Sequence, residues 1–171
     1  MVSARENSLV GRSESFTWRQ AQANDCAVLL DWRNDPVSVR YSKSKAPISE
    51  KDHNRWFTDA LRDDNTVLLI AETDGLPIAT TRFDRPSSDS PVYLVSINVA
   101  PSHRGKGMGK QLLRLAISNF FSLRNADLVA DVHQDNLASQ KIFASAGFLE
   151  KKVDGEFKQF LYSADTRKEN D

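Results

Sequence analysis

The segment Val92–Phe121 reads VYLVSINVAPSHRGKGMGKQLLRLAISNFF and changes its periodicity about halfway along. Over residues 92–99 the most apolar side chains take alternate positions, which is the period of a β-strand. From Met108 onward the apolar residues recur on one stripe, as on the buried face of an α-helix. Between them lies Arg104-Gly-Lys-Gly-Met-Gly109, whose three alternate glycines let the backbone turn sharply and approach a ligand. The segment therefore predicts a strand, a glycine-rich loop and a helix in succession.

The glycine-rich loop is a predicted site for a phosphate or a pyrophosphate. Backbone N–H groups point outward where a helix begins and its dipole is positive, and Arg104 and Lys106 add positive charge. A Walker loop is excluded, since it needs glycine at position 104 and serine or threonine where Gln111 stands. A Rossmann fingerprint is excluded because Lys110 takes the place of its third glycine. The alternative is a helix-opening turn that binds nothing.

The bulk composition fits one globular domain in a reducing compartment. The 171 residues are 40% hydrophobic and 27% charged, and the formal net charge is zero, which argues against a nucleic-acid partner. Cys26 is the single cysteine, and the three histidines stand far apart, so the sequence suggests neither a disulfide nor a metal site. No apolar run is long enough to span a bilayer, and no hydrophobic signal core opens the chain. We therefore expect a cytoplasmic protein without membrane partners, either a monomer or a homodimer.

The element order can be read along the whole chain. We expect a single domain over residues 15–163, with loose termini at 1–14 and 164–171. The two strands on either side of the central helix should be parallel, because strand–helix–strand units cross over right-handed. The predicted strands cover residues 16–19, 67–71, 78–83, 92–99, 128–132, 148–153 and 157–162. The predicted helices start at Asn24 or Asp25 and stop before Pro36, run from Ser49 through Leu61, follow the glycine-rich loop, and cover 136–146.

The pattern Arg104-x-x-Gly107-x-Gly109, after a strand and at the start of a helix, resembles the acetyl-CoA signature of the GNAT family of N-acetyltransferases. The element order is also similar, over nearly the whole chain. The resemblance implies a three-layer α/β (α+β) fold: a mixed, mostly antiparallel sheet of about seven strands, flanked by helices and splayed between its two central parallel strands. It implies acetyl-CoA as co-substrate and no metal, with the pantetheine arm in the splay and the thioester near Ser96–Asn98. The implied cofactor-binding residues here are Ile97, Val99, Arg104, Gly105, Lys106, Gly107, Met108 and Gly109.

A second segment, Asn136-Leu-Ala-Ser139 followed by Phe143 and Gly147-Phe148, resembles the GNAT pattern Asn-x-x-Ala-x-x-x-Tyr-x-x-x-Gly-Phe. Asn136 is either a helix cap only or a partner for a pantetheine amide, and Ser139 and Phe143 follow it in the implied CoA site. Where many relatives have a tyrosine that protonates the leaving thiolate, this chain has phenylalanine. Either another group donates that proton, or the thiolate leaves unassisted.

Two residues of the predicted strand 128–132 and its end are candidates for the base that accepts the proton of the attacking amine. Asp131 lies inside an apolar run, where a carboxylate is costly unless it is paired or used. It aligns with a glutamate of the ribosomal-protein alanine N-acetyltransferases, a GNAT branch. His133 lies on the same face of the strand. The alternative is that Asp131 is merely hydrogen-bonded near the end of a strand.

The front of the chain resembles the aminosugar N-acetyltransferases of the pseudaminic-acid pathway, which acetylate the 4-amino group of a UDP-linked sugar. The resemblance lies in residues 30–36 and 48–57, LDWRNDP and ISEKDHNRWF, and in ATTRFD at 79–84. It implies a nucleotide-sugar site formed by Arg33, Tyr41, His53 and Arg82. Two alternatives remain open: an N-acetyltransferase acting on a protein N-terminus, and a non-catalytic acyl-CoA-binding module.

Overall fold

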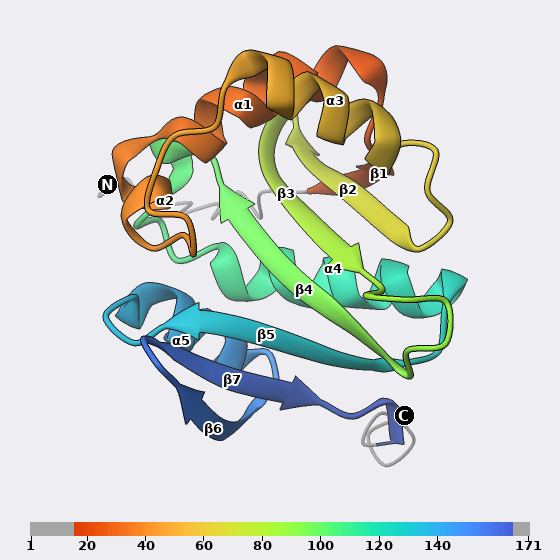
Figure 1. Cartoon of the computed structure of the whole chain (residues 1–171), viewed down its shortest axis with the longest axis vertical. Helices are drawn as coiled ribbons and strands as arrows, with labels where there is room; N and C mark the ends of the chain where they lie inside the picture. The colour runs from red at the N-terminus through yellow and green to blue at the C-terminus, as the bar shows by residue number, and fades with distance from the viewer. Residues whose placement is uncertain (1–15, 166–171) are drawn as a thin grey trace, which may run out of the picture.

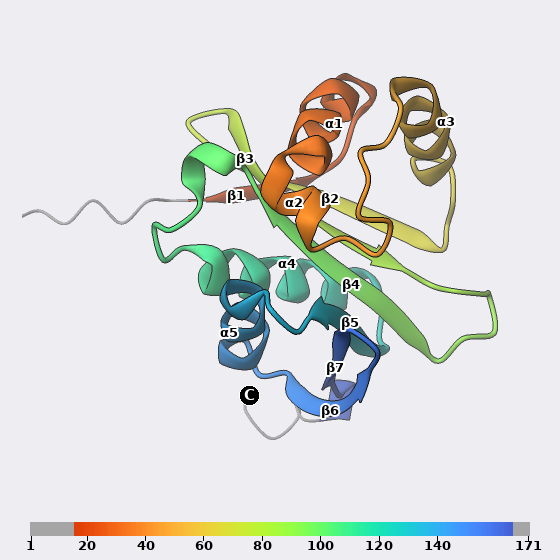
Figure 2. The ribbon, with the colours of Figure 1, turned by 60° about the vertical axis from the view of Figure 1, so that its left-hand side comes forward.

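A mixed seven-stranded sheet runs through the molecule, with helices on both of its faces (Figures 1 and 2). The computed structural model describes residues 16–165. The strand order is β1-β2-β3-β4-β5-β7-β6, and only β4 and β5 are parallel. The strands are β1 (Thr17–Gln20), β2 (Thr66–Thr73), β3 (Leu76–Asp84), β4 (Val92–Val99), β5 (Asp127–His133), β6 (Leu149–Asp154) and β7 (Phe157–Tyr162). The helices are α1 (Cys26–Asn34), α2 (Pro36–Arg40), α3 (Glu50–Ala60), α4 (Gly109–Leu123) and α5 (Leu137–Ser145), with short 3-10 turns at Ala23–Asp25 and Pro101–His103. The predicted three-layer fold is confirmed.

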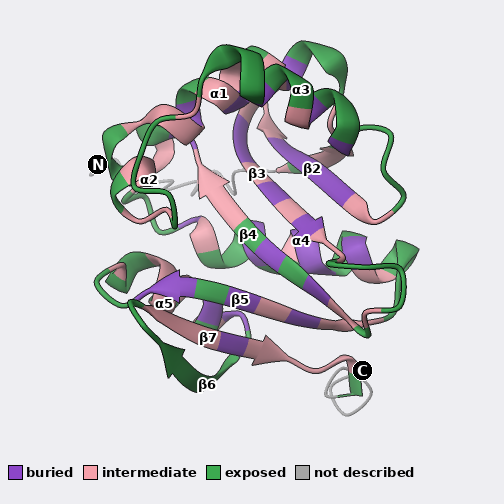
Figure 3. Cartoon of the chain, viewed as in Figure 1, coloured by how far each residue is buried: buried purple, intermediate pink, exposed green. Residues whose placement is uncertain are grey.

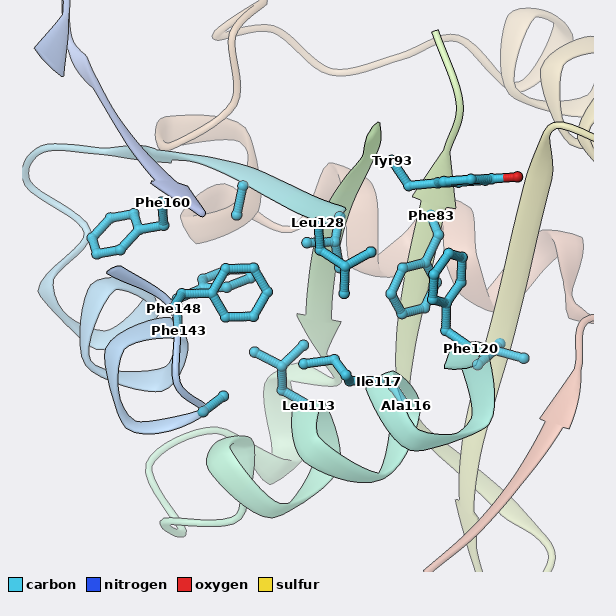
Figure 4. Close-up of a cluster of buried hydrophobic side chains, with 14 of the residues drawn as sticks. Phe83, Tyr93, Leu113, Ala116, Ile117, Phe120, Leu128, Phe143, Phe148 and Phe160 are labelled. Carbon is cyan, nitrogen blue, oxygen red and sulfur yellow. The ribbon is translucent and has the colours of Figure 1, made fainter. Parts of the chain in front are cut away.

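The larger core lies between the sheet and the two helices α4 and α5 (Figure 3). Helix α4 is amphipathic, and its buried stripe ends in Phe120, whose ring stacks on Phe83 at 4.4 Å between centroids. Figure 4 shows these rings with Tyr93 at one end of the cluster and Phe143 and Phe148 at the other. A smaller cluster on the opposite face packs α1 and α3 on the sheet, and it consists of Leu29, Trp32, Phe57, Leu68, Ile70 and Ala100. Burial of these aromatic rings adds a large apolar area to both clusters.

Helix α2 was not predicted from the sequence. Its N-cap is Asp35, whose carboxylate accepts hydrogen bonds from the N–H groups of Val37 (3.1 Å) and Ser38 (3.3 Å). Pro36 takes the first helical position, where its missing N–H costs nothing. The first helix does stop before Pro36 as expected, but the same Asp-Pro pair starts a new helix. This second start places Ser38 beside Asn98, near the end of β4.

Asp25 takes the N-cap position of α1, next to the predicted start of this helix. Asp25 precedes α1, but its carboxylate binds the guanidinium of Arg19 at 2.7 and 2.8 Å and makes no cap hydrogen bond to α1. The N–H of Gln22 also donates to it at 2.7 Å. Desolvation alone would raise the pKa of Asp25, but these hydrogen bonds outweigh it and lower that pKa. Asp25 thus links β1 to the start of α1, and its bond from Gln22 belongs to a capping box of the 3-10 turn Ala23–Asp25.

The predicted splay between β4 and β5 is present. The two strands pair only at Val92–Asp127, Tyr93–Leu128 and Leu94–Val129. Beyond these pairs β4 continues beside β3, and β5 continues beside β7 as far as His133. Figure 1 shows the two strands meeting at one end and diverging toward the other. The backbones of 95–99 and 130–133 therefore face each other across an opening without a shared ladder.

The described chain extends slightly past the predicted domain end. The N–H of Ala164 donates to the carboxylate of Asp127 at 2.8 Å, which fixes the second residue after β7 to the start of β5. The remaining predicted loose segments, 1–14 and 166–171, lie outside the described residues. Within 16–165, no helix has the length and apolar character needed to cross a membrane.

Candidate active site

The glycine-rich loop joins the open end of β4 to α4. Gly105 and Gly107 have φ angles of +73° and +77°, a left-handed conformation that residues with a Cβ rarely adopt. Helix α4 begins at Gly109, and its N-cap residue Met108 provides no side-chain hydrogen bond to the first turn. The first N–H groups of α4 are therefore not capped by that side chain, while Lys106 is exposed beside them. This arrangement suits an anion such as a pyrophosphate.

Arg104 was predicted to add positive charge to the phosphate site, but its guanidinium binds neighbouring groups of the protein. Its Nε donates to the carbonyl oxygen of Val99 at 2.9 Å, and Nη2 donates to Ser38 at 2.9 Å and to Asn98 at 3.1 Å. Its Nη1 is ion-paired with Asp35, and the hydrogen bond from Arg104 lowers the pKa of that carboxyl. The guanidinium thus links β4 to the start of α2. Positive charge at the loop comes from Lys106 and from the dipole of α4.

The glycines of the motif serve two purposes. At Gly107 nothing lies within 4 Å of where a Cβ would be, so this position requires glycine only for its φ angle. At Gly109 a Cβ would lie 2.4 Å from Cδ1 of Ile142, a side chain of α5. Gly109 therefore allows α4 and α5 to pack closely, which the motif alone did not indicate.

We expect Gly107→Ala and Gly109→Ala to have separable effects. Gly107→Ala should weaken acetyl-CoA binding by roughly ten-fold or more, because left-handed geometry costs a residue with a Cβ about 1–2 kcal/mol and the loop will shift. Gly109→Ala should lower the free energy of unfolding by about 1–3 kcal/mol through overpacking. Calorimetry with CoA and urea unfolding measure the two effects. Unchanged CoA affinity in Gly107→Ala would contradict the assignment of the loop.

The Asn136 segment forms the start of α5 beside the open end of β5. Asn136 is the N-cap, and its side-chain oxygen accepts the N–H of Ser139 at 3.1 Å. Ser139 is half-buried in the first turn. Phe143 is 2% exposed and packs edge-on against Phe148 with centroids 5.0 Å apart. Its ring therefore belongs to the core, although the GNAT pattern that this segment resembles has a tyrosine at this position.

Asp131 lies on β5 at the splay, on the face opposite α4 and α5. Its carboxylate accepts hydrogen bonds from Lys43 at 2.6 Å and from Gln159, its neighbour on β7, at 3.3 Å. Desolvation alone would raise the pKa of Asp131, but the hydrogen bonds from Lys43 and Gln159 outweigh it and lower the pKa. Asp131 is thus a charged, partly accessible carboxylate suited to hold an ammonium group.

His133 is less accessible than Asp131. Its side chain is 7% exposed, and its ring packs against Tyr41 and Phe157 with centroids 5.6 and 5.4 Å away. Nδ1 accepts the N–H of Asp135 at 3.2 Å, so a neutral imidazole carries its proton on Nε2. Nε2 faces the carboxylate of Glu156 at 3.8 Å. His133 and Tyr41 therefore form a wall beside Asp131.

Two of the predicted acceptor-site residues, Arg33 and Arg82, lie close enough to repel each other. Arg33 Nη2 donates to Ser44 at 3.0 Å, whereas its Nη1 is buried without a hydrogen-bond partner. Desolvation lowers the pKa of Arg33, and the charge of Arg82 lowers it further. Arg82 lies over the ring of Trp56 at 5.1 Å and is ion-paired with Asp84 at 2.6 Å. Among the residues that the structure describes, Arg33 forms no ion pair, so an anionic ligand would supply one.

The structure places the fourth predicted acceptor residue, His53, inside the protein. It is 2% exposed, lies between α1 and α3, and has its Nε2 2.9 Å from the carbonyl oxygen of Cys26. Desolvation lowers the pKa of His53, and the charge of Arg33 adds to this effect. A neutral, packed imidazole beside Arg33 helps to position α1 and α3, and direct contact with a ligand would require these helices to move.

The sheet register brings the separate pieces together. Arg82 on β3 pairs with Ser96 on β4, so their side chains share one face. Two residues beyond the last β4–β5 pair, Ser96 comes level with Asp131 across the opening. On the other face, Ile97 and Val99 pack toward Met108 and Leu112. One row across the sheet therefore carries a cation, a hydroxyl and a carboxylate, and the loop for a pyrophosphate lies at the end of the same opening.

Residues 16–149 match the family described as the acetyltransferase (GNAT) domain. The chain belongs to this family. It is an acetyltransferase domain of the GNAT type, so the predicted enzyme class is confirmed. The finer resemblance to the pseudaminic-acid-pathway enzymes stays a prediction.

Individual relatives and solved structures are similar to this chain at low identity. An uncharacterized protein of Methanocaldococcus jannaschii is 21% identical over 155 residues, which are 90% of this chain and 32% of that protein, so the chain spans about a third of that relative. The L-methionine sulfoximine/L-methionine sulfone acetyltransferase of Salmonella typhimurium is 28% identical over 136 residues, covering 78% of this chain and 80% of that enzyme. The structure of the aminoglycoside acetyltransferase AAC(6')-Ib with ribostamycin and coenzyme A aligns with a TM-score of 0.76 at 21% identity, covering 90% of this chain and 97% of that one.

Several residues of the site were missed by sequence reasoning. Lys43 reaches Asp131 from a loop 88 positions away, and Phe157 and Gln159 approach from β7. Asp35, Ser38 and Asn98 hold Arg104. Residues 40–47 are polar and basic, but nothing in this composition indicated which contacts Lys43 would make.

Proposed function

We propose that this enzyme acetylates the primary amine of a small molecule that also carries an anionic group, and that this molecule is a nucleotide-linked amino sugar. The observation that carries the proposal is Arg33, a half-buried guanidinium with one buried nitrogen lacking a partner and with Arg82 repelling it. A planar donor fork of this kind matches the oxygens of a diphosphate. The sequence resemblance at 30–36 and 48–57 supports the same acceptor.

Acetyl-CoA would bind through the loop and the splay. The N–H groups around Gly107 and Gly109 would bind the pyrophosphate, and Lys106 would add charge. The pantetheine arm would lie in the opening, where the backbone of 95–99 has no partner on β5. The acyl group would then lie near Ser96. Asn136 caps α5 at the same end and offers its amide nitrogen to the arm.

The amine would attack from the face that carries Arg82, Ser96 and Asp131. Asp131 holds the incoming ammonium by charge, and its proton passes to the carboxylate or through it to water. The free amine attacks the thioester carbonyl in a ternary complex, the C–N bond forms, and the C–S bond breaks. Because Phe143 is buried and has no proton to give, the CoA thiolate leaves unassisted and is protonated by water.

An amino acid acceptor is the second candidate, because a carboxylate also fits a guanidinium fork. The Salmonella relative is named for acetylating methionine sulfoximine and methionine sulfone, which are amino acids with a carboxylate. The two candidates differ in reach. Arg82 and Asp131 lie on strands with β4 between them, so their backbones are about 10 Å or more apart. An α-amino acid has its carboxylate one carbon away from its amine, whereas a nucleotide sugar has its diphosphate on the other side of the sugar ring and spans more of this distance.

We expect release of CoA thiol to be fastest with UDP-linked amino sugars in a panel that also contains α-amino acids, spermidine, an aminoglycoside and N-terminal peptides. Arg33→Lys should raise KM for the preferred acceptor by roughly ten-fold or more and leave KM for acetyl-CoA nearly unchanged. Arg124→Lys, at the far end of α4, is the matched control. His53→Ala is less informative, since it opens a cavity between two helices. A peptide turned over faster than any UDP-amino sugar would refute the proposal.

A further inference from the structure

A loop that follows α2 crosses from the β4 side of the splay to the β5 side. It is fixed there by two lysines, Lys43 on Asp131 at 2.6 Å and Lys45 on Glu156 of the β6–β7 turn. Tyr41, at the start of the loop, packs on His133. The loop therefore lies over the acceptor side of the opening between the strands.

The ammonium group of Lys43 contacts a carboxylate and an aromatic ring. Besides the carboxylate of Asp131, it faces the ring of Phe157 on β7 at 5.5 Å. Gln159 donates to the other carboxylate oxygen of Asp131 and so orients it. A fixed carboxylate together with an aromatic face is a favourable site for an ammonium ion. We call Asp131 and Phe157 together the ammonium seat.

Lys43, whose ammonium group occupies the ammonium seat, is not a buried side chain. The side chain of Lys43 is 67% exposed, while that of Asp131 is 25% exposed. An exposed lysine pairs weakly and exchanges readily, because holding its long side chain costs entropy. By register, Asp131 is level with Ser96, where the proposed function places the acyl group. Lys43 therefore presents a primary amine, the functional group of an acceptor, at the level where an acceptor amine would react.

We propose that Lys43 is a self-acetylation site, with the ammonium seat holding its amine in the place of an acceptor. This inference rests on the proposed function. The step is the ordinary one: the Lys43 ammonium gives its proton to Asp131 or to water, and its nitrogen attacks the thioester carbonyl. The amide C–N bond forms, the C–S bond breaks, and CoA leaves as a thiolate that takes up a proton. Acetylation removes the charge of Lys43, so the ion pair with Asp131 is lost and the seat is opened to other amines.

The experiment is to incubate the full chain with acetyl-CoA alone and to map acetyl-lysine by peptide mass spectrometry over time. Lys43 should be acetylated at least ten-fold faster than Lys45, which lies on the same loop but is paired with Glu156 outside the seat. Asp131→Asn and Phe157→Leu should each slow Lys43 acetylation several-fold or more, and Lys45→Arg should not change it. The loop variant Gly107→Ala should slow it in proportion to its loss of CoA affinity.

Each other outcome counts against the proposal. Equal acetylation of Lys43, Lys45 and other exposed lysines, unaffected by Asp131→Asn, would show spontaneous chemistry in solution and would overturn it. An unmodified Lys43 in a protein that binds acetyl-CoA and acetylates a small amine would overturn this inference alone. Failure to bind acetyl-CoA at all, measured by calorimetry, would instead refute the proposed function and this inference with it.

Discussion

Replacing Asp131 by asparagine should lower turnover of the acceptor amine by roughly ten- to ten-thousand-fold while the affinity for acetyl-CoA persists. The amide keeps the shape of the side chain but neither attracts an ammonium nor accepts its proton. Steady-state kinetics of thiol release and calorimetry with CoA measure the two quantities separately. Asp89→Asn, in the exposed loop before β4, is the control and should leave both unchanged.

The ion pair with Lys43 gives this experiment a pH dependence. The hydrogen bond from Lys43 lowers the pKa of Asp131, so in the wild type this carboxylate stays charged at pH values at which an ordinary aspartate would begin to be protonated. Lys43→Met should raise that pKa and therefore move the acidic limb of kcat/KM to higher pH. If Asp131→Asn turns over near the wild-type rate, the proton is accepted elsewhere, by His133 or by a water held on the backbone.

Arg104→Ala should lower the free energy of unfolding by about 2 kcal/mol at neutral pH, even though this arginine belongs to a cofactor motif. The variant loses hydrogen bonds to Val99, Ser38 and Asn98 and leaves the carboxylate of Asp35 without its ion pair. This loss of stability is smaller than for a fully buried ion pair, since the side chains of Arg104 and Asp35 are 26% and 18% exposed. Urea unfolding measures it.

The stabilisation by Arg104 should weaken in acid. The pKa of Asp35 is lowered in the folded protein, so its contribution is fully present well above the unfolded value of about 3.9 and is lost as the pH falls through the folded pKa. The gap in stability between wild type and Arg104→Ala should therefore narrow below about pH 4. Arg114→Ala, on the exposed face of α4, should show no such gap. Equal stability of wild type and Arg104→Ala at pH 7 would contradict the role of this side chain.

The cofactor half of the site could be predicted because its signals are local. The strand period of 92–99, the glycines of the loop and the apolar stripe of α4 follow one another in the sequence, and each forms the element it predicts. The parallel pairing of β4 and β5 followed from the handedness of the crossover between them. The splay followed from family resemblance.

The acceptor half could be predicted only in part, because its contacts join distant residues. Arg104 was expected to face a phosphate, but Asp35, 69 positions earlier, binds its guanidinium. His53 belongs to a segment that resembles a ligand-binding motif, yet the helix that contains it turns the imidazole inward. Lys43 lies in a loop without periodicity, so nothing in the sequence indicated its contact with Asp131. Tertiary packing, which no window of sequence contains, decides such cases.

The short pairing between β4 and β5 also has an energetic consequence for the whole molecule. A continuous ladder past Leu94 would add roughly four hydrogen bonds, each worth about 0.5–1.5 kcal/mol net. The free energy of unfolding of the free protein is therefore a few kcal/mol lower than with a complete ladder, which is a large part of the total stability of a domain of this size. A ligand whose own amide groups complete the ladder recovers that deficit on binding. Part of the affinity for such a ligand thus comes from the hydrogen-bonding backbone groups that β4 and β5 do not pair with each other in the unliganded sheet.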